Sequence, residues 1–356
     1  MDIGVIRERG LFDCRVAITP SVARQLHLAG NTVWVETGAG VRAMFNDTEY
    51  LRAGARIVYS PAEVLQRVEL LAKISRPTSD ELALCRPGMV LMAFYHCAVA
   101  GNWLTGALSD RAITAIGCEI IQRDNGHLPV LAAISEIAGQ MTVPIAAHLL
   151  RSSSGGRGIL LGGTPGVPPA RVVLLGVGTV GFAAARTALA SGAHVIGFDK
   201  DPVKLRHILE HLPAVETCLL DEDSLAEAVI SADVVVGAIL VAGTRPPHVV
   251  TRSMVESMKP GSAIIDVSID QGGCVETSRP TTLSEPTFVY KGVTHFCVPN
   301  LTADLGRSSS VAFSQATLPY LLKIAETGLD AALRSCPELA RGVLSLVSTA
   351  TQGSRL

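Results

Sequence analysis

The sequence has few charged and few aromatic residues. Charged side chains make up 17% of the 356 residues and aromatic ones 4%, and the 30 Lys and Arg nearly balance the 32 Asp and Glu. Recognition of nucleic acid depends on a basic surface, and a net charge of -2 offers none. We therefore expect no nucleic-acid partner and no acidic one.

Signals for export and for membrane insertion are also missing. The chain does not open on a charged segment followed by an apolar one. It contains no run of about 18 uncharged apolar residues, the length that a membrane-spanning helix needs. We expect neither secretion nor a membrane span, and the cytoplasm is the expected location.

The cysteines have no ligand-like spacing. There are eight, and they include no CxxC pair and no grouping with histidine. This excludes the common zinc patterns and favours reduced, mostly buried thiols, so no metal is expected. Cys97 follows a histidine, but no base for a cysteine nucleophile is evident nearby in the sequence.

The chain is rich in apolar residues, and predicted strands alternate regularly with predicted helices along it. Its length and 48% hydrophobic residues suffice for two domains with sizeable cores. In the first 130 residues, short apolar runs alternate with helical patterns, the first of which has Thr19 as a possible cap and Pro20 at its start. This alternation predicts a doubly wound parallel sheet. Strands are expected at 2–6, 32–36, 68–74, 89–94 and 112–116, and helices after 20, at 47–53 and at 60–67.

The second half repeats the alternation. A long helix is expected at 135–150, with Pro144 a possible kink, and a Gly/Pro/Ser-rich connection follows it. Strands and helices then alternate again, which predicts a second doubly wound domain, and a helix at 312–327 is long enough to return to the first. Strands are expected at 171–175, 194–198, 216–220, 233–238, 262–267 and 295–298, with helices at 182–191, 203–211, 224–231 and 251–258.

The segment RVVLLGVGTVG contains the glycine pattern GxGxxG directly after an apolar strand. Gly176 permits a tight turn, Gly178 lets a pyrophosphate approach the backbone, and Gly181 allows close packing of helix and strand. Asp199 ends the next strand, where its carboxylate can bond the ribose diol and repel a 2′-phosphate. The stretch predicts an NAD site, although Lys200 leaves NADP open. A glycine turn that serves packing alone is the alternative.

Four reactive side chains follow predicted strand ends, where ligands of open α/β sheets bind. Arg15 can bind a carboxylate in a bidentate manner, Lys73 supplies a point charge, and His96 is a residue type whose unperturbed pKa suits proton transfer. Asp270 could stabilise an iminium or transfer a proton. A surface charge, an ion-pair partner, a structural histidine and a turn-forming aspartate are the respective alternatives.

Several motifs resemble those of alanine dehydrogenases, the family that includes the α part of nicotinamide nucleotide transhydrogenase. They are IGVIRE, RVAITP, LLAKISRP, FYHCA, ISEIAGQM, GGRGILLGGTPGV, VVLLGVGTVG, VGAILVAGTRPP, MKPGSAIIDVSIDQGGCVETSRPTT and ATLPYLL. The resemblance implies that Arg15 and Lys73 bind pyruvate and that His96 and Asp270 are catalytic. The residues that it and the glycine motif assign to the cofactor are Ser135, Gly176, Gly178, Thr179, Val180, Gly181, Asp199, Lys200, Leu240, Ile269, Asp270 and Asn300.

The resemblance also implies an organisation and an activity. A Rossmann NAD domain at 135–308 would be inserted into a substrate domain formed by 1–134 and 309–356, and a homohexamer is expected. The activity would be reversible NAD-dependent oxidative deamination of L-alanine to pyruvate and ammonia.

The chain departs from the family around the expected substrate pocket. Lys-Glu-Pro is usual where Ser75, Arg76 and Pro77 stand, methionine where Ile134 stands, and Met-Pro where Leu301 and Thr302 stand. A different small 2-amino acid, or an opine-type condensation of a 2-oxo acid with a larger amine, therefore stays an alternative. A non-catalytic NAD-binding protein, like the transhydrogenase subunit, is a third possibility.

Overall fold

The computed structural model describes residues 1–100, 102–241 and 244–345. The chain forms two compact units. Unit 1 comprises Met1–Ile134 and Ala303–Leu356, and unit 2 comprises Ser135–Thr302. The chain thus returns to unit 1 at Ala303, where the sequence analysis placed the return at 309. Residues 346–356 of the predicted substrate domain lie outside the described residues.

Unit 1 is built on a seven-stranded sheet in the order β14-β6-β5-β4-β1-β2-β3. All neighbours pair in parallel except β14, which runs antiparallel to β6. The parallel sheet that the alternating pattern predicts is therefore confirmed. Its strands are β1 (Asp2–Val5), β2 (Thr32–Glu36), β3 (Arg56–Val58), β4 (Leu70–Ala72), β5 (Val90–Ala93), β6 (Thr114–Gly117) and β14 (Val343–Ser345).

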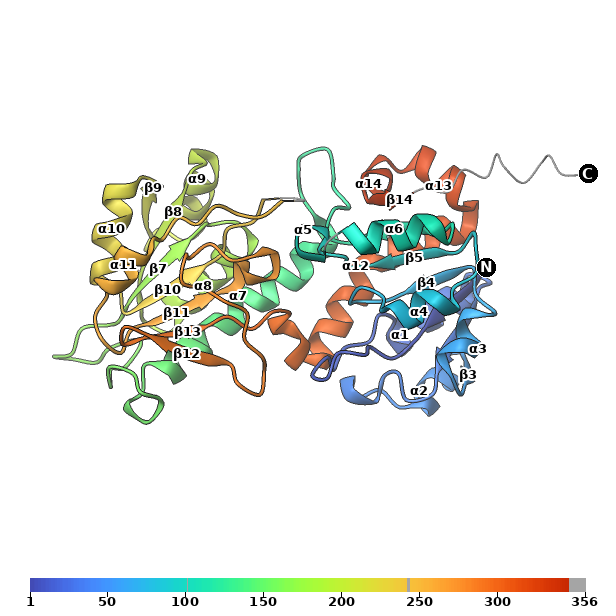
Figure 1. The fold of residues 1–356 in the computed structure, drawn as a ribbon, viewed down its shortest axis with the longest axis horizontal. Coiled ribbons are helices and arrows are strands. Elements are labelled where there is room, and N and C mark those ends of the chain that lie inside the picture. The colour runs from blue at the N-terminus through green and yellow to red at the C-terminus, as the bar shows by residue number, and fades with distance from the viewer. Residues whose placement is uncertain (101, 242–243, 346–356) are drawn as a thin grey trace, which may run out of the picture. The chain divides into compact units, whose positions relative to one another are not determined.

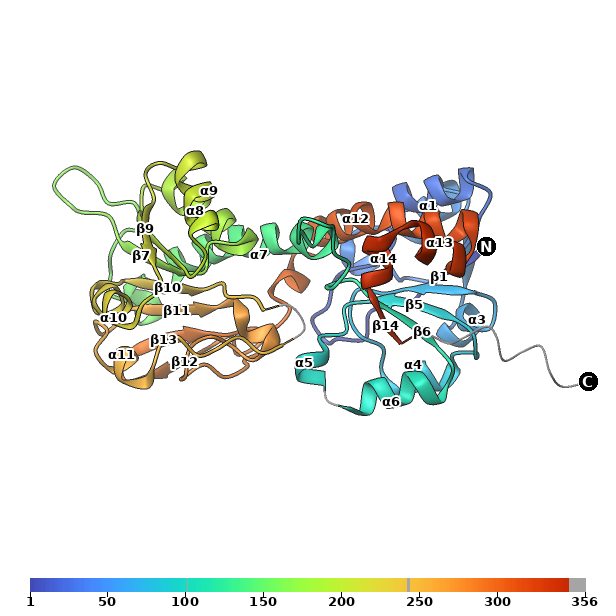
Figure 2. The same ribbon diagram turned by 90° about the horizontal axis from the view of Figure 1, so that it is seen from above.

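Helices cover both faces of this sheet, each over its own hydrophobic core (Figure 2). One face carries α1 (Pro20–Leu28), α12 (Gly306–Thr327) and α13 (Leu329–Ser335), and the other carries α3 (Pro61–Leu65), α4 (Ser79–Leu84) and α6 (Asn102–Asp110). The remaining helical segments of unit 1 are η1 (Val41–Ala43), α2 (Asp47–Arg52), α5 (Cys97–Ala100), η4 (Leu301–Asp304, which begins in unit 2) and α14 (Pro337–Arg341).

Local capping explains where two of these helices begin. Asn46 and Glu49 form a reciprocal capping box at α2, and Thr78 and Glu81 form another at α4. Thr19 is the N-cap residue of α1 by position, but its side chain makes no capping bond. Its hydroxyl donates instead to Ser314, so the predicted side-chain cap is wrong.

Unit 2 has a second seven-stranded sheet in the order β12-β13-β11-β10-β7-β8-β9, parallel except for the β12–β13 pair (Figure 1). The second doubly wound sheet is thus also confirmed. Its strands are β7 (Arg171–Leu175), β8 (His194–Asp199), β9 (Glu216–Leu219), β10 (Val234–Gly237), β11 (Ala263–Asp266), β12 (Thr287–Tyr290) and β13 (Val293–Phe296). Its helices are α7 (Pro129–Leu149, which begins in unit 1), η2 (Ser152–Ser154), α8 (Thr179–Ala190), α9 (Pro202–His211), α10 (Glu222–Ser231), α11 (Arg252–Glu256) and η3 (Val267–Gln271).

Helix α7 begins six residues before the predicted 135, and Pro144 lies within it. Among the described residues, it is the one helix long and apolar enough to cross a membrane by length and composition, and 44% of its most apolar window is buried. A core helix of a soluble protein passes the same test, so this is weak evidence for a span.

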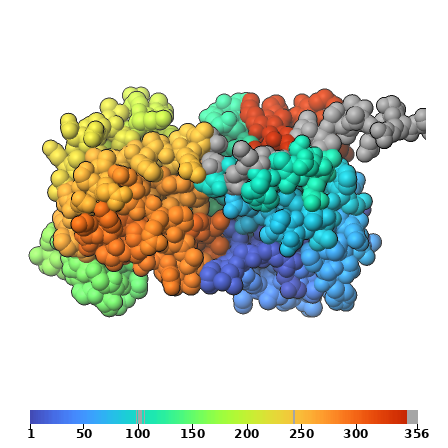
Figure 3. Space-filling view, viewed as in Figure 1, coloured from blue at the N-terminus to red at the C-terminus, as the bar shows by residue number. Residues whose placement is uncertain are grey.

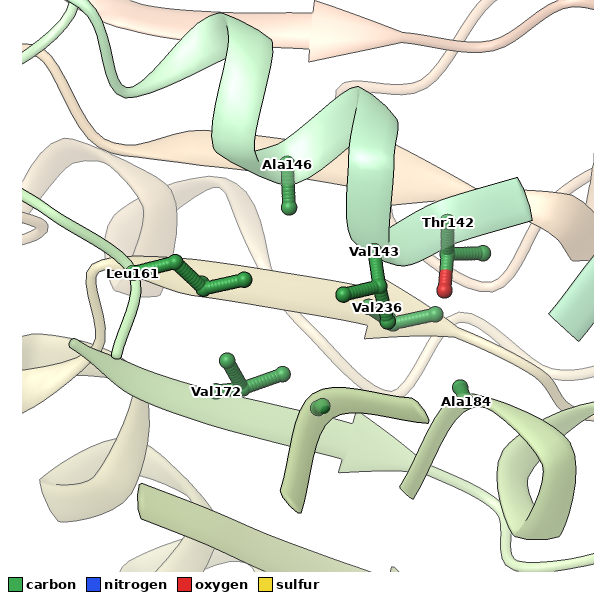
Figure 4. Close-up of a pocket in the computed structure, with 8 residues that line it drawn as sticks. Thr142, Val143, Ala146, Leu161, Val172, Ala184 and Val236 are labelled. Carbon is green, nitrogen blue, oxygen red and sulfur yellow. The ribbon is translucent and has the colours of Figure 1, made fainter. Parts of the chain in front are cut away.

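A small apolar cavity lies in unit 2, where α7 and α8 face β7 and β10 (Figure 4). Thr142 contributes the one hydroxyl among its lining side chains, and that hydroxyl donates to the Gly139 carbonyl. No predicted site residue lines this cavity. It is a packing defect of the core rather than a place for chemistry.

The C-terminal helices complete unit 1, and their red segments lie along one rim of it in Figure 3. Helix α12 also fixes the segment before α1 through buried serines. The Val16 N–H donates to Ser310 Oγ at 2.8 Å, and the Thr19 N–H donates to Ser314 Oγ at 3.0 Å. These bonds satisfy backbone groups near Arg15 that are shielded from water.

We expect Ser310→Ala to lower the free energy of unfolding by about 1–3 kcal/mol, because the buried Val16 N–H would lose its acceptor. Ser335→Ala is the matched control, since Ser335 also donates to the carbonyl four residues earlier but is exposed. Denaturant unfolding of both variants measures the difference. Equal stabilities would contradict the role given to Ser310.

Candidate active site

The glycine turn after β7 leaves open space at one glycine only. Gly176 has φ +92°, and a Cβ there would lie 2.7 Å from the Ala238 carbonyl oxygen; a Cβ at Gly181 would lie 2.0 Å from the Gly176 oxygen. A Cβ at Gly178 would meet nothing within 4 Å. Gly178 is also the N-cap of α8, without a side-chain cap. The turn therefore fits a pyrophosphate held by the helix N-terminus.

Asp199 ends β8 beside this turn. Its Oδ2 accepts the Val177 N–H at 3.0 Å, and its Oδ1 accepts the Asp201 N–H at 3.0 Å. The carboxylate is thereby held against the glycine turn, as a ribose ligand must be, while Lys200 is exposed. Each carboxylate oxygen has more than one acceptor direction, so these bonds are compatible with a sugar hydroxyl.

A second group of candidates lies beyond β11. Asp270, in η3, accepts the Asn300 N–H on Oδ1 at 2.6 Å, and Asn300 has φ +53°. Ile269 beside it is buried, and Leu240, in the loop after β10, is 46% exposed. The bond between Asp270 and Asn300 brings together two residues that are 30 apart in the sequence. Ser135 lies on α7, and Thr179 and Val180 open α8.

In unit 1, Arg15 is already engaged by a carboxylate. Its Nε donates to Asp13 Oδ1 at 2.8 Å and its Nη2 to Asp13 Oδ2 at 2.7 Å, and Ser75 Oγ lies within hydrogen-bond distance of both side chains. The Arg15 side chain is 1% exposed. Burial alone would raise the pKa of Asp13, but the bonds from Arg15 outweigh it and lower that pKa. Asp13 thus holds the guanidinium in one plane.

Lys73 is buried between two carboxylates. Its Nζ lies 3.2 Å from Glu8 and 3.2 Å from Glu81, and its side chain is 1% exposed. Burial alone would lower the pKa of Lys73, but the two carboxylates raise it, whereas burial raises the pKa of Glu8. Glu8 also accepts the backbone N–H groups of Ile74 and Ser75. Lys73 is therefore an ion-pair partner, as one of the interpretations of the sequence allowed. A substrate carboxylate would compete with Glu8 and Glu81 for its ammonium group.

His96 follows β5 with its backbone in the left-handed region, at φ +49°. Glu119 Oε1 accepts the N–H groups of Tyr95 and His96 at 3.0 and 2.7 Å. The ring of Phe94 stacks on the imidazole at 5.8 Å between ring centroids. The imidazole is thus fixed at the same end of the sheet as Lys73, because β4 and β5 are parallel neighbours.

Their places after strand ends indicated Arg15, Lys73 and His96 in the sequence. The carboxylates bonded to these residues were not predicted; they are Glu8, Asp13, Glu81 and Glu119. The capping pattern of Thr78 and Glu81 is the one signal among them that was readable in the sequence. Within the described ranges, His, Cys, Asp and Glu form no group of three or more that could hold a metal ion.

One doubly wound unit has a glycine turn that fits a phosphate, and the other has Arg15, Lys73 and His96 beyond its strand ends. This combination is typical of dinucleotide-dependent enzymes. Family models described as alanine dehydrogenase/PNT, N-terminal and C-terminal domains, match residues 4–138 and 142–352. The chain belongs to the alanine dehydrogenase/PNT family.

Individual relatives agree over nearly the full length. The alanine dehydrogenase of Halomonas elongata is 42% identical over 96% of this chain and 92% of its own. A solved L-alanine dehydrogenase matches with a TM-score of 0.91 at 40% identity, covering 98% of this chain and 96% of its own. A Sinorhizobium meliloti transhydrogenase, at 24% identity and a TM-score of 0.82 over 98% of each chain, shares the fold.

We expect Lys73→Met to lower the free energy of unfolding by about 3–5 kcal/mol, because two buried carboxylates would lose their cation. Burial already raises the pKa of Glu8, and losing the positive charge of Lys73 would raise it further, so the deficit should be largest above neutral pH and shrink as the pH falls toward 4.5. Unfolding by denaturant at several pH values measures this.

Lys259→Met is the control, because Lys259 pairs with Asp233 from a partly exposed position and should matter less. A stable Lys73→Met enzyme with a raised KM for the oxo acid alone would instead assign Lys73 to direct substrate contact.

Proposed function

We propose that this protein is an NAD-dependent alanine dehydrogenase that interconverts L-alanine with pyruvate and ammonia. The observation that carries the proposal is the full-length similarity to proteins named alanine dehydrogenase, at 42% identity for the Halomonas relative. The open glycine turn and the anchored Asp199 supply the features that an NAD site needs. A bound nicotinamide supplies or accepts the hydride, and the protein supplies position and charge.

Unit 2 binds the cofactor in this proposal. Gly178 and the N-terminus of α8 would hold the pyrophosphate together with Thr179, Val180 and Gly181, and Asp199 would bond the ribose diol. Ser135 and Leu240 would line the nicotinamide nucleotide, and Ile269 and Asn300 would also contact the cofactor. Asp270 would stabilise positive charge on the iminium or move a proton.

Unit 1 binds the oxo acid. Arg15 binds its carboxylate through the positive charge of a guanidinium that Asp13 holds in one plane. Lys73 adds positive charge at the same strand edge, although its two ion pairs limit direct contact. His96 transfers the proton to or from the oxygen at C2, since imidazole titrates near neutral pH.

The test is NADH oxidation with pyruvate and ammonia, repeated with 2-oxobutyrate and larger oxo acids and with primary amines in place of ammonia. We expect turnover with pyruvate and ammonia, and measurable turnover with 2-oxobutyrate. Ile134 and Leu301 are buried branched side chains, and Thr302 replaces a residue that would stiffen the loop. A requirement for a larger amine would instead establish an opine-type enzyme.

The same proposal covers the assembly and the location. The protein would be a homo-oligomer, a hexamer by analogy with the family, in the cytoplasm. Size-exclusion chromatography with light scattering measures the assembly directly.

Asp199 should make the enzyme prefer NADH to NADPH, because its carboxylate is held where a 2′-phosphate would be repelled. Catalytic efficiencies with the two cofactors, measured in the wild-type enzyme and in Asp199→Ser, check this. We expect the preference for NADH to shrink in the variant. Comparable efficiencies in the wild-type enzyme would refute the assignment.

His96→Ala and Asp270→Asn should each remove most turnover, by roughly 10²- to 10⁴-fold, while NADH binding stays nearly unchanged. Both residues are assigned to proton transfer or charge stabilisation rather than to nucleotide affinity. Steady-state rates and NADH fluorescence titration separate the two effects. Near-normal turnover in either variant would remove that residue from the mechanism.

A further inference from the structure

Glu119 has one carboxylate oxygen whose role the proposed function leaves unexplained. Its side chain is 7% exposed, and Oε1 carries both backbone bonds described above. Within the described part of the chain, Oε2 is buried and has no hydrogen-bond partner. Buried polar atoms without partners are rare in native proteins, and a carboxylate oxygen is the costlier kind to leave in that state.

The imidazole of His96 contains a second such atom. Its Nδ1 is buried and, in the same described residues, also lacks a partner. Nδ1 connects to the His96 backbone nitrogen through Cα, Cβ and Cγ, and that nitrogen is the one that donates to Glu119 at 2.7 Å. Glu119 Oε2 and His96 Nδ1, which both lack a partner, therefore belong to two residues already joined by a hydrogen bond from the His96 backbone.

The surrounding backbone is arranged to hold this pair. Strands β5 and β6 are parallel neighbours with Ala93 opposite Gly117, and the Cys118 N–H continues the pairing by donating to the Ala93 carbonyl at 2.8 Å. Glu119 thus follows β6 where His96 follows β5. A left-handed backbone is unfavourable for a residue with a Cβ, and the hydrogen bond that the His96 N–H donates to Glu119 compensates for it.

We propose that Glu119 is the positioning residue of His96. One oxygen holds the backbone of His96, and the other accepts the Nδ1–H of the imidazole once the two side chains rotate toward each other, so that Nε2 is the atom that exchanges a proton with the substrate. The negative charge also stabilises the protonated imidazole. The effect on turnover rests on the proposed function, whereas the tautomer of His96 does not.

The other ionisable groups beside this pair do not titrate near neutral pH. Burial raises the pKa of Tyr95 and of Cys118 well above their ordinary values, and it raises that of Cys97 from 9.0. Arg76, whose charge acts on Cys97, stays protonated. Tyr95, Cys118 and Cys97 are therefore not the groups that a change of charge near neutral pH would report.

Glu119→Gln tests the proposal, because the amide oxygen can still accept the backbone N–H groups while the charge is removed. We expect the pKa of His96, followed by NMR with labelled histidine and assigned with His96→Gln, to fall by about one unit, a tenfold change in the protonated fraction. The pH at which alanine oxidation rises should fall with it, because His96 must be unprotonated there. The KM for NADH should not change.

Glu119→Asp, which keeps the charge, should restore part of the shift, and Glu36→Gln is the matched control. Glu36 is also a buried carboxylate that accepts a backbone N–H, that of Arg7, but it lies away from the histidine. An unchanged His96 pKa in Glu119→Gln would limit Glu119 to a backbone role and overturn the proposal.

The wild-type protein offers a test that does not depend on a variant folding. Nitrogen-15 shifts of neutral His96 should show the proton on Nδ1, and a proton on Nε2 would also overturn the proposal. An enzyme inactive with pyruvate and ammonia but with the Nδ1–H tautomer would reject the function and keep the inference.

Discussion

Both units depend on buried carboxylates that bond to backbone N–H groups just beyond the strand ends. Glu8 holds Ile74, Glu119 holds His96, and Asp199 holds Val177, in each case at 3.0 Å or less. Loops that leave a parallel sheet lose their ladder partners, yet their backbone groups still require hydrogen bonds when they are buried. In this chain, acidic side chains provide those bonds where the candidate residues lie.

This constraint also fixes the electrostatics of the site. A buried carboxylate needs a compensating charge or several donors, and Asp13 and Glu8 obtain the first from Arg15 and Lys73. The two cations that we propose for binding the substrate carboxylate are therefore held in place before any substrate arrives. Preorganised charge of this kind lowers the cost of binding, because the side chains lose little further freedom.

The sequence predicted the architecture well where the pattern was long or repeated. Strand β2, Thr32–Glu36, and strand β7, Arg171–Leu175, match the prediction residue for residue because each is a compact apolar run. It missed β3, β12 and β14, which have three or four residues each, too few for a period to show. Helix α4 was missed although its capping pattern is present.

Some residues of the candidate site could be predicted from the sequence, and others could not. Arg15, Lys73, His96 and Asp270 could be found because they follow strand ends, a position that the sequence reveals. Their partners could not, since Glu8 lies 66 residues from Ile74, and Glu119 lies 23 from His96. No local pattern encodes such contacts, which arise only when parallel strands bring their ends together.

The central claim of this account is hydride transfer from NADH to carbon 2 of the imine formed from pyruvate and ammonia, which gives L-alanine. Reaction of the enzyme with pyruvate, nitrogen-15 ammonia and NADH deuterated at both C4 positions tests it most directly. The account predicts L-alanine with one deuterium at C2 and nitrogen-15 in its amino group, formed in equal amount to the cofactor oxidised. Deuterated lactate, or alanine without deuterium, would contradict it.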